Sequence, residues 1–211
     1  MRYAILLALL VFVVACTADT PTPAPPTDDL TNYAFESETT TTVTFERNSN
    51  LGALVVETES AGVVDYSSQT RERQMTLHSS FIGAEDSQEI HAFSTETQGH
   101  TRRQDGAWRE SEPVADILGM VQSGVSGEDL VRLALTFEER QLLALTDMSQ
   151  ATVVSEDIVV DEQDGQIVAV HVDLLIEYED EVDNLQMVVE HTTRFSQYNT
   201  APTPQRPAGL A

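Results

Sequence analysis

Long runs in which apolar and polar residues alternate are the feature that most constrains how this chain folds. In the clearest run, every second residue from 168 to 178 is apolar: Val168, Val170, Val172, Leu174, Ile176 and Tyr178. Successive side chains of a β-strand point to opposite faces of a sheet, so a period of two predicts a strand with one buried and one solvated face. The chain is therefore expected to form a sheet with one face covered.

Similar alternation predicts more strands on both sides of a central segment. We expect them over residues 33–46, 53–66, 71–81, 88–95 and 99–104 before this segment, and over 151–160, 168–178 and 185–195 after it. Asp105-Gly106 and Asp164-Gly165 are typical hairpin turns. Strands with segregated helices indicate an α+β fold, with a strongly curved antiparallel sheet.

The central segment, residues 113–147, has the pattern of amphipathic helices. Pro113 suits a first helical position, and Val114, Ile117 and Val121 belong to an apolar stripe of helical spacing. Thr136 and Glu139 have the spacing of a capping box, and Ser126 with Asp129 resembles a second one. We expect these helices to insert on the concave face of the sheet.

The N-terminus has the pattern of a secretory signal peptide. Arg2 provides a basic start, and residues 4–15 are an uninterrupted apolar run, too short for an ordinary membrane-spanning helix of about 20 residues. The sequence from Val13 to Cys16 resembles the bacterial lipobox, which implies cleavage before Cys16 and attachment of a diacylglycerol to its sulfur. The alternative is an ordinary signal peptide, or a short anchor helix, with an incidental cysteine.

A lipid on Cys16 predicts a protein that is anchored to the extracytoplasmic face of a membrane. The residue after the cysteine is Thr17 rather than Asp, which in lipoprotein sorting of the LolA type implies the outer membrane where one exists. Residues 16–31 are rich in Pro and Thr, as in an extended tether. The predicted organisation is a signal peptide (1–15), the lipidated cysteine with its tether (16–31), one folded domain (32–199) and a disordered tail (200–211).

Charge and cysteine content limit the partners of this chain. The formal net charge is -24 and the pI about 4.2, and the chain contains eleven arginines but no lysine. So acidic a protein is not expected to bind nucleic acid or to attach to anionic lipid headgroups by charge. A salt-rich habitat is one explanation for the acidic excess, and base composition alone could explain the missing lysines. A single cysteine allows no intrachain disulfide.

No sequence motif indicates catalysis, a cofactor or a metal. The five histidines form no HxH or HExxH pair, and there is neither a G-x-S-x-G elbow nor a glycine-rich phosphate loop. His171 and His191 fall on predicted strands and are expected at the surface or at an edge. The acidic stretch 161–165 is expected to be a solvated hairpin turn, and 179–183 a solvent loop, with weak cation binding as the alternative for the second. We therefore predict that the protein is not an enzyme.

The layout of the chain resembles a known family. The lipobox, the tether, a strand with the sequence TNYAFESETTTTVTFE, the DGAW hairpin, the ILGMVQ helix and the closing VVEHTTRFSQYN strand together resemble LolA-like lipoproteins, which include the LppX/LprG-type lipid carriers. The resemblance implies a half-barrel whose concave side is plugged by helices. It also implies an apolar space for acyl chains between the sheet and the helices.

Two hypotheses follow for function. In the first, a lipid-like or lipoprotein ligand binds between sheet and helices, lined by Phe35, Leu77, Trp108, Leu118, Val121 and Val172. In the second, the core is packed and the domain is a non-catalytic interaction module of the cell envelope, with no small ligand. Trp108 itself has two interpretations, an aromatic residue that packs on the sheet edge or the lip of a pocket.

Overall fold

The computed structural model describes residues 30–46, 50, 52–124, 128–142, 151–179 and 184–210. The predicted signal peptide, Cys16 and nearly all of the tether lie outside these residues. Ser126, from the weaker of the two predicted capping boxes, also lies outside them. So do residues 180–183 of the predicted acidic loop.

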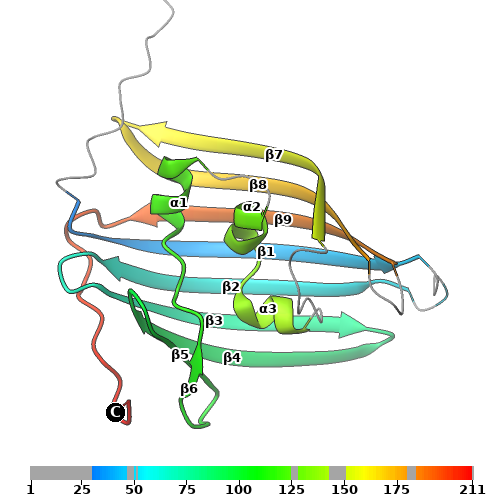
Figure 1. Cartoon of the computed structure of the whole chain (residues 1–211), viewed down its shortest axis with the longest axis horizontal. Helices are drawn as coiled ribbons and strands as arrows, with labels where there is room; N and C mark the ends of the chain where they lie inside the picture. The colour runs from blue at the N-terminus through cyan, green and yellow to red at the C-terminus, as the bar shows by residue number, and fades with distance from the viewer. Residues whose placement is uncertain are drawn as a thin grey trace, which may run out of the picture.

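Nine strands of the described residues form one antiparallel sheet, in the order β6-β5-β4-β3-β2-β1-β9-β8-β7 (Figure 1). The strands are β1 (Asn32–Phe45), β2 (Leu54–Asp65), β3 (Thr70–Phe81), β4 (Ala84–Thr95), β5 (Gly99–Arg103), β6 (Arg109–Ser111), β7 (Ala151–Gln163), β8 (Gln166–Glu179) and β9 (Asn184–Ser196). The strands predicted from alternation are confirmed. β4 begins at Ala84 rather than at residue 88, and the short β6 was not predicted.

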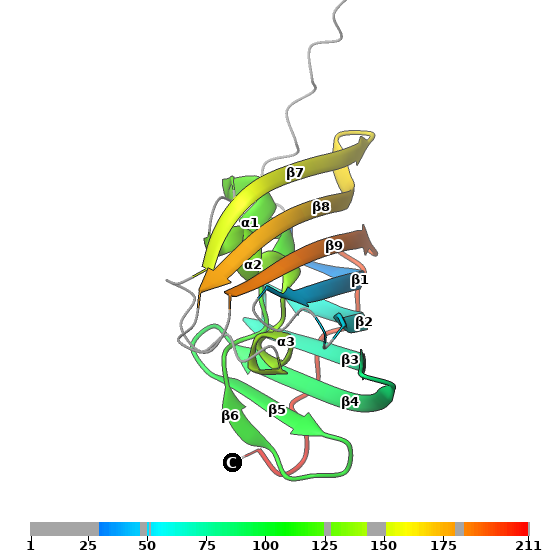
Figure 2. The ribbon, with the colours of Figure 1, turned by 90° about the vertical axis from the view of Figure 1, so that its right-hand side faces the viewer.

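The order of the strands follows from consecutive hairpins on either side of β1. β1 to β6 follow one another outward in one direction, and β9, β8 and β7 extend the sheet from the other side of β1. The first and last of the described strands thus meet in the middle of the sheet, while β6 and β7 are its edges. Seen from the side, the sheet is twisted and open (Figure 2).

The fold class predicted from the sequence, an α+β half-barrel with helices inserted on its concave face, is wrong. The described part of the protein is mostly sheet, and this sheet does not close into a barrel. Within the central segment, the described residues form only short helices. These are α1 (Ile117–Ser123), α2 (Glu128–Ala134) and α3 (Phe137–Leu142). Residues 113–116, which were expected to start a helix, are irregular, and the backbone of Val114 bonds to side chains of the sheet.

α1 begins at Ile117 and not at Pro113 because Asp116 is its N-cap. The Asp116 side chain accepts a hydrogen bond from the backbone N–H of Gly119, which an N-cap residue typically does. The helix ends at Ser123, and its C-cap Gly124 has a positive φ of 79°, which is readily available only to glycine. Two local signals therefore limit α1 to two turns.

The core lies on the sheet face that packs against α1, α2 and α3, called the inner face below. One apolar cluster joins strand residues such as Tyr33 and Ile176 to Leu118 of α1 and Leu135, which follows α2. Along β8 the predicted alternation is confirmed, since Val170, Val172, Leu174, Ile176 and Tyr178 are buried and Asp173 and Glu177 are exposed. The inner face is therefore the one that alternation identified.

The chain segment after β9 returns to the start of β1. Asn199 Oδ1 accepts hydrogen bonds from the backbone N–H of Thr31, at 2.7 Å, and from its hydroxyl. The backbone N–H of Ala201 donates to Asn32 Oδ1 at 2.9 Å, and Ala201 is buried. The start of β1 and the residues that directly follow β9 thus lie side by side at one end of the sheet.

Candidate functional site

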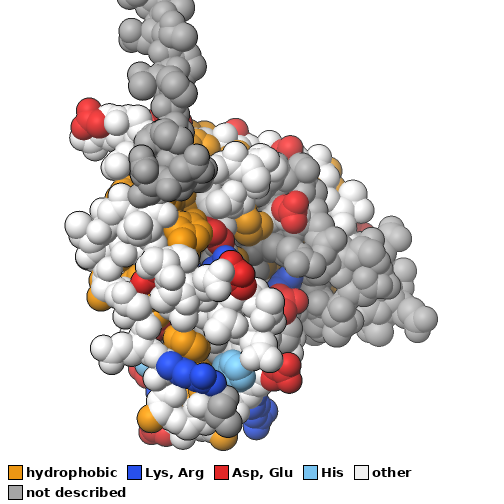
Figure 3. All heavy atoms as spheres, turned by 60° about the vertical axis from the view of Figure 1, so that its left-hand side comes forward, with side chains coloured by type: hydrophobic (Ala, Val, Ile, Leu, Met, Phe, Trp, Pro, Cys, Tyr) orange, Lys and Arg blue, Asp and Glu red, His pale blue; other side chains and the backbone are white. Residues whose placement is uncertain are grey.

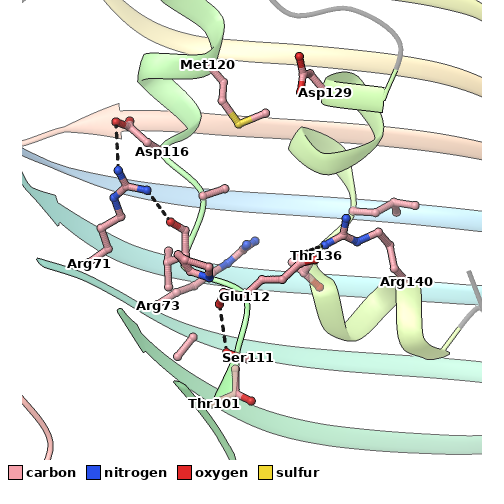
Figure 4. A pocket seen from close by; sticks show the side chains of 15 residues that line it. Arg71, Arg73, Thr101, Ser111, Glu112, Asp116, Met120, Asp129, Thr136 and Arg140 are labelled. Carbon is pink, nitrogen blue, oxygen red and sulfur yellow. Dashed lines mark hydrogen bonds and ion pairs between the residues drawn. The ribbon is translucent and has the colours of Figure 1, made fainter. Parts of the chain in front are cut away.

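A pocket of about 450 Å³ lies between the inner face of β3 to β5 and the segment that crosses over it (Figure 4). Its size falls within the range of small-molecule sites. Its lining includes three arginines, Arg71, Arg73 and Arg140, and apolar side chains from Ala92, Val114 and Met120. The site thus combines charge with apolar surface.

One wall of the pocket is residues 112–116, called the strap below. The backbone N–H of Val114 donates to Ser94 Oγ at 3.0 Å, and its carbonyl accepts from Arg71 Nη1 at 2.9 Å. The strap also passes close to β5. A Cβ atom at Gly99 would lie 2.0 Å from the carbonyl oxygen of Glu112, so this approach requires glycine.

The strap ends at Asp116, whose carboxylate is a hub of hydrogen bonds. Oδ1 accepts from the hydroxyls of Tyr33, at 2.9 Å, and Tyr66, at 3.0 Å, as well as from Gly119 N–H. Oδ2 lies 3.8 Å from Arg71 Nη2. Burial, followed by the Asp116 charge, raises the pKa of both tyrosines above the usual range, so they remain donors. This hub fixes the end of the strap on β1, on β3 and on the turn between β2 and β3.

The opposite wall is α3, which a capping box positions. The backbone N–H of Glu139 donates to Thr136 Oγ1 at 3.1 Å, and Glu139 Oε2 accepts from the backbone N–H of Thr136. This predicted capping box is confirmed. The Glu139 side chain is fully buried, and its Oε1 accepts from the Thr58 hydroxyl of β2, so the cap also attaches α3 to the sheet.

Arg140 follows directly and extends from α3 toward the strap. Its Nη2 donates to Glu112 Oε2. The Arg140 side chain is only 8 % exposed, whereas that of Glu112 is 48 % exposed. Arg140 Nε is also buried, and no described residue accepts a hydrogen bond from it. This ion pair therefore joins a buried cation to a carboxylate that is half in solvent.

Arg73 lies on the floor of the pocket, on β3. Its Nη2 donates to Ser60 Oγ at 2.8 Å, and its guanidinium lies 5.9 Å from the centre of the Phe35 ring. At that distance a cation over an aromatic face is attracted by the ring. Arg73 is therefore positioned by two neighbouring strands.

The charge of the pocket differs from that of the whole chain. The chain has a net charge of -24, yet three of its eleven arginines line this one pocket, together with Glu112, Asp116 and Asp129. In a space-filling view, hydrophobic, basic and acidic side chains lie next to one another near the middle of one face (Figure 3). The pocket is thus a place where an anion meets less repulsion than elsewhere on the protein.

Beside the pocket, a row of buried polar side chains crosses the middle of the inner face. His191 Nδ1 lies 2.9 Å from the Thr39 hydroxyl and Nε2 lies 2.8 Å from the Thr193 hydroxyl, which in turn bonds to Ser37 at 2.8 Å. His191 is 3 % exposed, so the prediction that it lies at the surface or at an edge is wrong. Burial, together with the charges of Arg73 and His171, lowers the pKa of His191 to about 3.

The six residues predicted to line a ligand site do not line this pocket. Phe35, Leu77, Leu118 and Val172 are 0–3 % exposed within the apolar cluster, and Val121 packs against that cluster. Trp108 lies apart from them, just before the edge strand β6, with the Arg102 guanidinium 5.2 Å from its ring centre.

Sequence reasoning missed the three pocket arginines, although β3 contained a signal for two of them. Arg71 and Arg73 have the same parity as the buried Met75 and Leu77, which places them on the inner face. An arginine on the buried parity of a strand is unusual enough to mark a site. Arg140 had no comparable signal, because its partner Glu112 is distant in the sequence.

Other kinds of site find no support in the described residues. No group of three or more His, Cys, Asp or Glu among them could bind a metal ion. None of the helices in the described part of the chain has the length and apolar character needed to cross a membrane. Comparison with known proteins found no matching family model, curated protein or solved structure. The resemblance to LolA-like lipoproteins thus stays a prediction from the layout of the sequence.

Proposed function

We propose that this protein is a membrane-anchored, extracytoplasmic binding protein that takes up a small amphipathic molecule. The observation that carries the proposal is the pocket behind the strap. It has the volume of a small-molecule site, and its lining combines arginines with apolar side chains such as Val114 and Met120. A ligand with one polar and one apolar end matches such a lining.

The proposed site differs from the one expected at first. The large apolar side chains between α1 and the sheet are packed together, as Leu118 and Val172 show, and are not the lining of the pocket. The pocket lies beside them, where the strap replaces a helix. The proposed ligand is therefore lipid-like in being amphipathic, and its apolar part is small enough for a pocket of about 450 Å³.

The proposed anchor is the lipid on Cys16, supported by the apolar run that precedes it and the Pro- and Thr-rich sequence that follows. Replacement of Cys16 by Ser should abolish attachment, because the chain has no other thiol to modify. We expect the wild-type protein to partition into detergent and its intact mass to include a diacylglycerol. The anchor is refuted if the wild-type mass lacks this group or the Cys16→Ser mass includes it.

Ligand uptake is tested on the full chain with Cys16→Ser, which has no lipid of its own at residue 16. Small amphiphiles below their micelle concentration, such as octanoate and octanol, should raise its melting temperature. At a hundredfold excess over Kd, binding should add about 2.7 kcal/mol to the free energy of unfolding. Adding Ala92→Trp should remove this rise, because Ala92 lines the pocket and an indole would fill it.

Ala84→Trp is the matched control, since Ala84 is exposed at the start of the same strand, β4. It should leave the response to octanoate unchanged. If neither amphiphile shifts the melting temperature, or if Ala92→Trp retains the full shift, the binding function fails. The second candidate, a cell-envelope interaction module with a packed core, would then be favoured, since the tight packing of Leu118 and Val172 agrees with it.

A further inference from the structure

The two residues of the ion pair between Arg140 and Glu112 differ in how deeply they are buried. Arg140 is almost completely buried, on a helix that is attached to the sheet through Glu139 and Thr58. Glu112 belongs to the irregular strap, and about half of its side chain is in solvent. Because a buried cation needs an anionic partner, Arg140 cannot leave the pair at low cost. Glu112 can turn toward water, where a carboxylate is well solvated.

The guanidinium of Arg140 also has more donor capacity than Glu112 uses. Nη2 donates to Glu112, while Nε is buried and has no acceptor among the described residues. Nε and Nη2 lie on the same edge of the guanidinium, which is the edge that binds carboxylate or phosphate with two parallel hydrogen bonds. A buried donor without an acceptor is costly, so a second oxygen on this edge would be favourable.

From these observations we infer that Glu112 is a displaceable partner of Arg140, and that the pocket takes an amphiphile whose carboxylate or phosphate replaces it. This inference rests on the proposed function and names its ligand class. The incoming anion would bond to both Nε and Nη2 of Arg140. Arg73 and Arg71, which line the same pocket, favour a negative group there.

The rest of the lining indicates that the anion is part of a larger molecule. Val114 and Met120 line the pocket beside the arginines, and Figure 4 shows Met120 extending into it from α1. A free phosphate ion would leave this apolar surface in contact with water. A carboxylate or phosphate with a short apolar chain would cover it.

The experiment measures the affinity of the full chain with Cys16→Ser for four probes by calorimetry. The probes are octanoate, octyl phosphate, octanol and inorganic phosphate. We expect the two anionic amphiphiles to bind at least tenfold more tightly than either octanol or inorganic phosphate. Glu112→Gln should strengthen octanoate binding several-fold, because the competing carboxylate is gone and Arg140 lacks its anion.

Two variants provide the controls. Glu110→Gln removes an equal charge from exposed β6, outside the pocket lining, and should leave the affinity for octanoate unchanged. Arg140→Met should remove the preference for octanoate over octanol. Circular dichroism checks that each variant is folded, and Glu112→Gln decides the outcome if Arg140→Met does not fold.

The outcomes separate this inference from the proposed function. If octanol binds as tightly as octanoate, or Glu112→Gln leaves octanoate binding unchanged, the displacement mechanism is wrong although the binding function stands. If inorganic phosphate binds as tightly as octyl phosphate, the ligand is a free anion, and the inference that it is an amphiphile is wrong. If none of the four probes binds, the proposed function fails together with the inference.

Discussion

The inner face of the sheet has two parts that the same alternation of residues builds but that differ in chemistry. On the β8 and β9 side, Val172, Ile176 and Met187 are fully buried, and the apolar cluster fills the space above them. On the β3 side, the corresponding positions include Arg71 and Arg73, and a pocket lies above them. Alternation thus determines which face turns inward, while the residue types on that face decide whether it is packed or open.

The largest expected effect tests the packed part. Ile176→Ala should reduce the free energy of unfolding by about 2–5 kcal/mol, because it removes buried methylene groups and leaves a cavity. Glu177→Ala, on the exposed face of the same strand, should change it by no more than about 0.5 kcal/mol. Urea unfolding of both variants measures the difference. Equal losses would show that β8 does not separate a buried from a solvated face.

The next largest effect is a pH dependence of stability, and it tests the row of buried polar side chains around His191. His191 has a pKa of about 3 in the folded protein, against about 6.5 when unfolded. Below pH 6.5 the unfolded state binds a proton that the folded state does not, so stability is lost as the pH falls from 6.5 toward 3. Within this window the loss from this one group approaches about 1.4 kcal/mol per pH unit.

His191→Gln can still bond to the hydroxyls of Thr39 and Thr193 but does not titrate, so its stability should fall less steeply with pH. Urea unfolding at pH 6.5, 5.5 and 4.5 compares the slopes of the two proteins. His78→Gln, at an exposed position, should keep the wild-type slope. A His191→Gln slope that matches the wild type would mean that this histidine is not buried in its neutral form.

The smallest effect tests the wall of the pocket. Thr136→Ala removes the side-chain half of the capping box on α3, which typically costs about 0.5–2 kcal/mol. Thr97→Ala, in an exposed turn, is the control and should stay within about 0.5 kcal/mol. If the two variants lose the same stability by thermal unfolding, the cap does not contribute to positioning α3.

The strands could be predicted because alternation is a local property of the sequence. The run that contains Val172 and Ile176 predicts its strand and its buried face without reference to any other segment. The central segment could not be predicted in the same way. Val114 has the spacing of a helix, but its backbone bonds to Ser94 and Arg71, two residues of the distant sheet. Such contacts override a local preference for helix.

The site was less predictable than the fold, for the same physical reason. His191 shares the parity of the buried Met187 and Val189, but a histidine is tolerated there only because Thr39 and Thr193 satisfy both ring nitrogens. These pairings depend on which strands become neighbours. The Arg140–Glu112 pair depends on how the strap crosses the sheet. Neither is present in any local pattern.

The central place of β1 has a mechanical consequence. β1 is the first strand of the described chain, and it pairs with β2 along one side and with β9 along the other, over nearly its whole length. A force applied at Leu30, on the side of the proposed anchor, would have to shear β1 from both neighbours at once. An edge strand such as β7 could be peeled away from one neighbour, bond by bond. A domain pulled by its N-terminus is therefore loaded through a strand that is held on both sides.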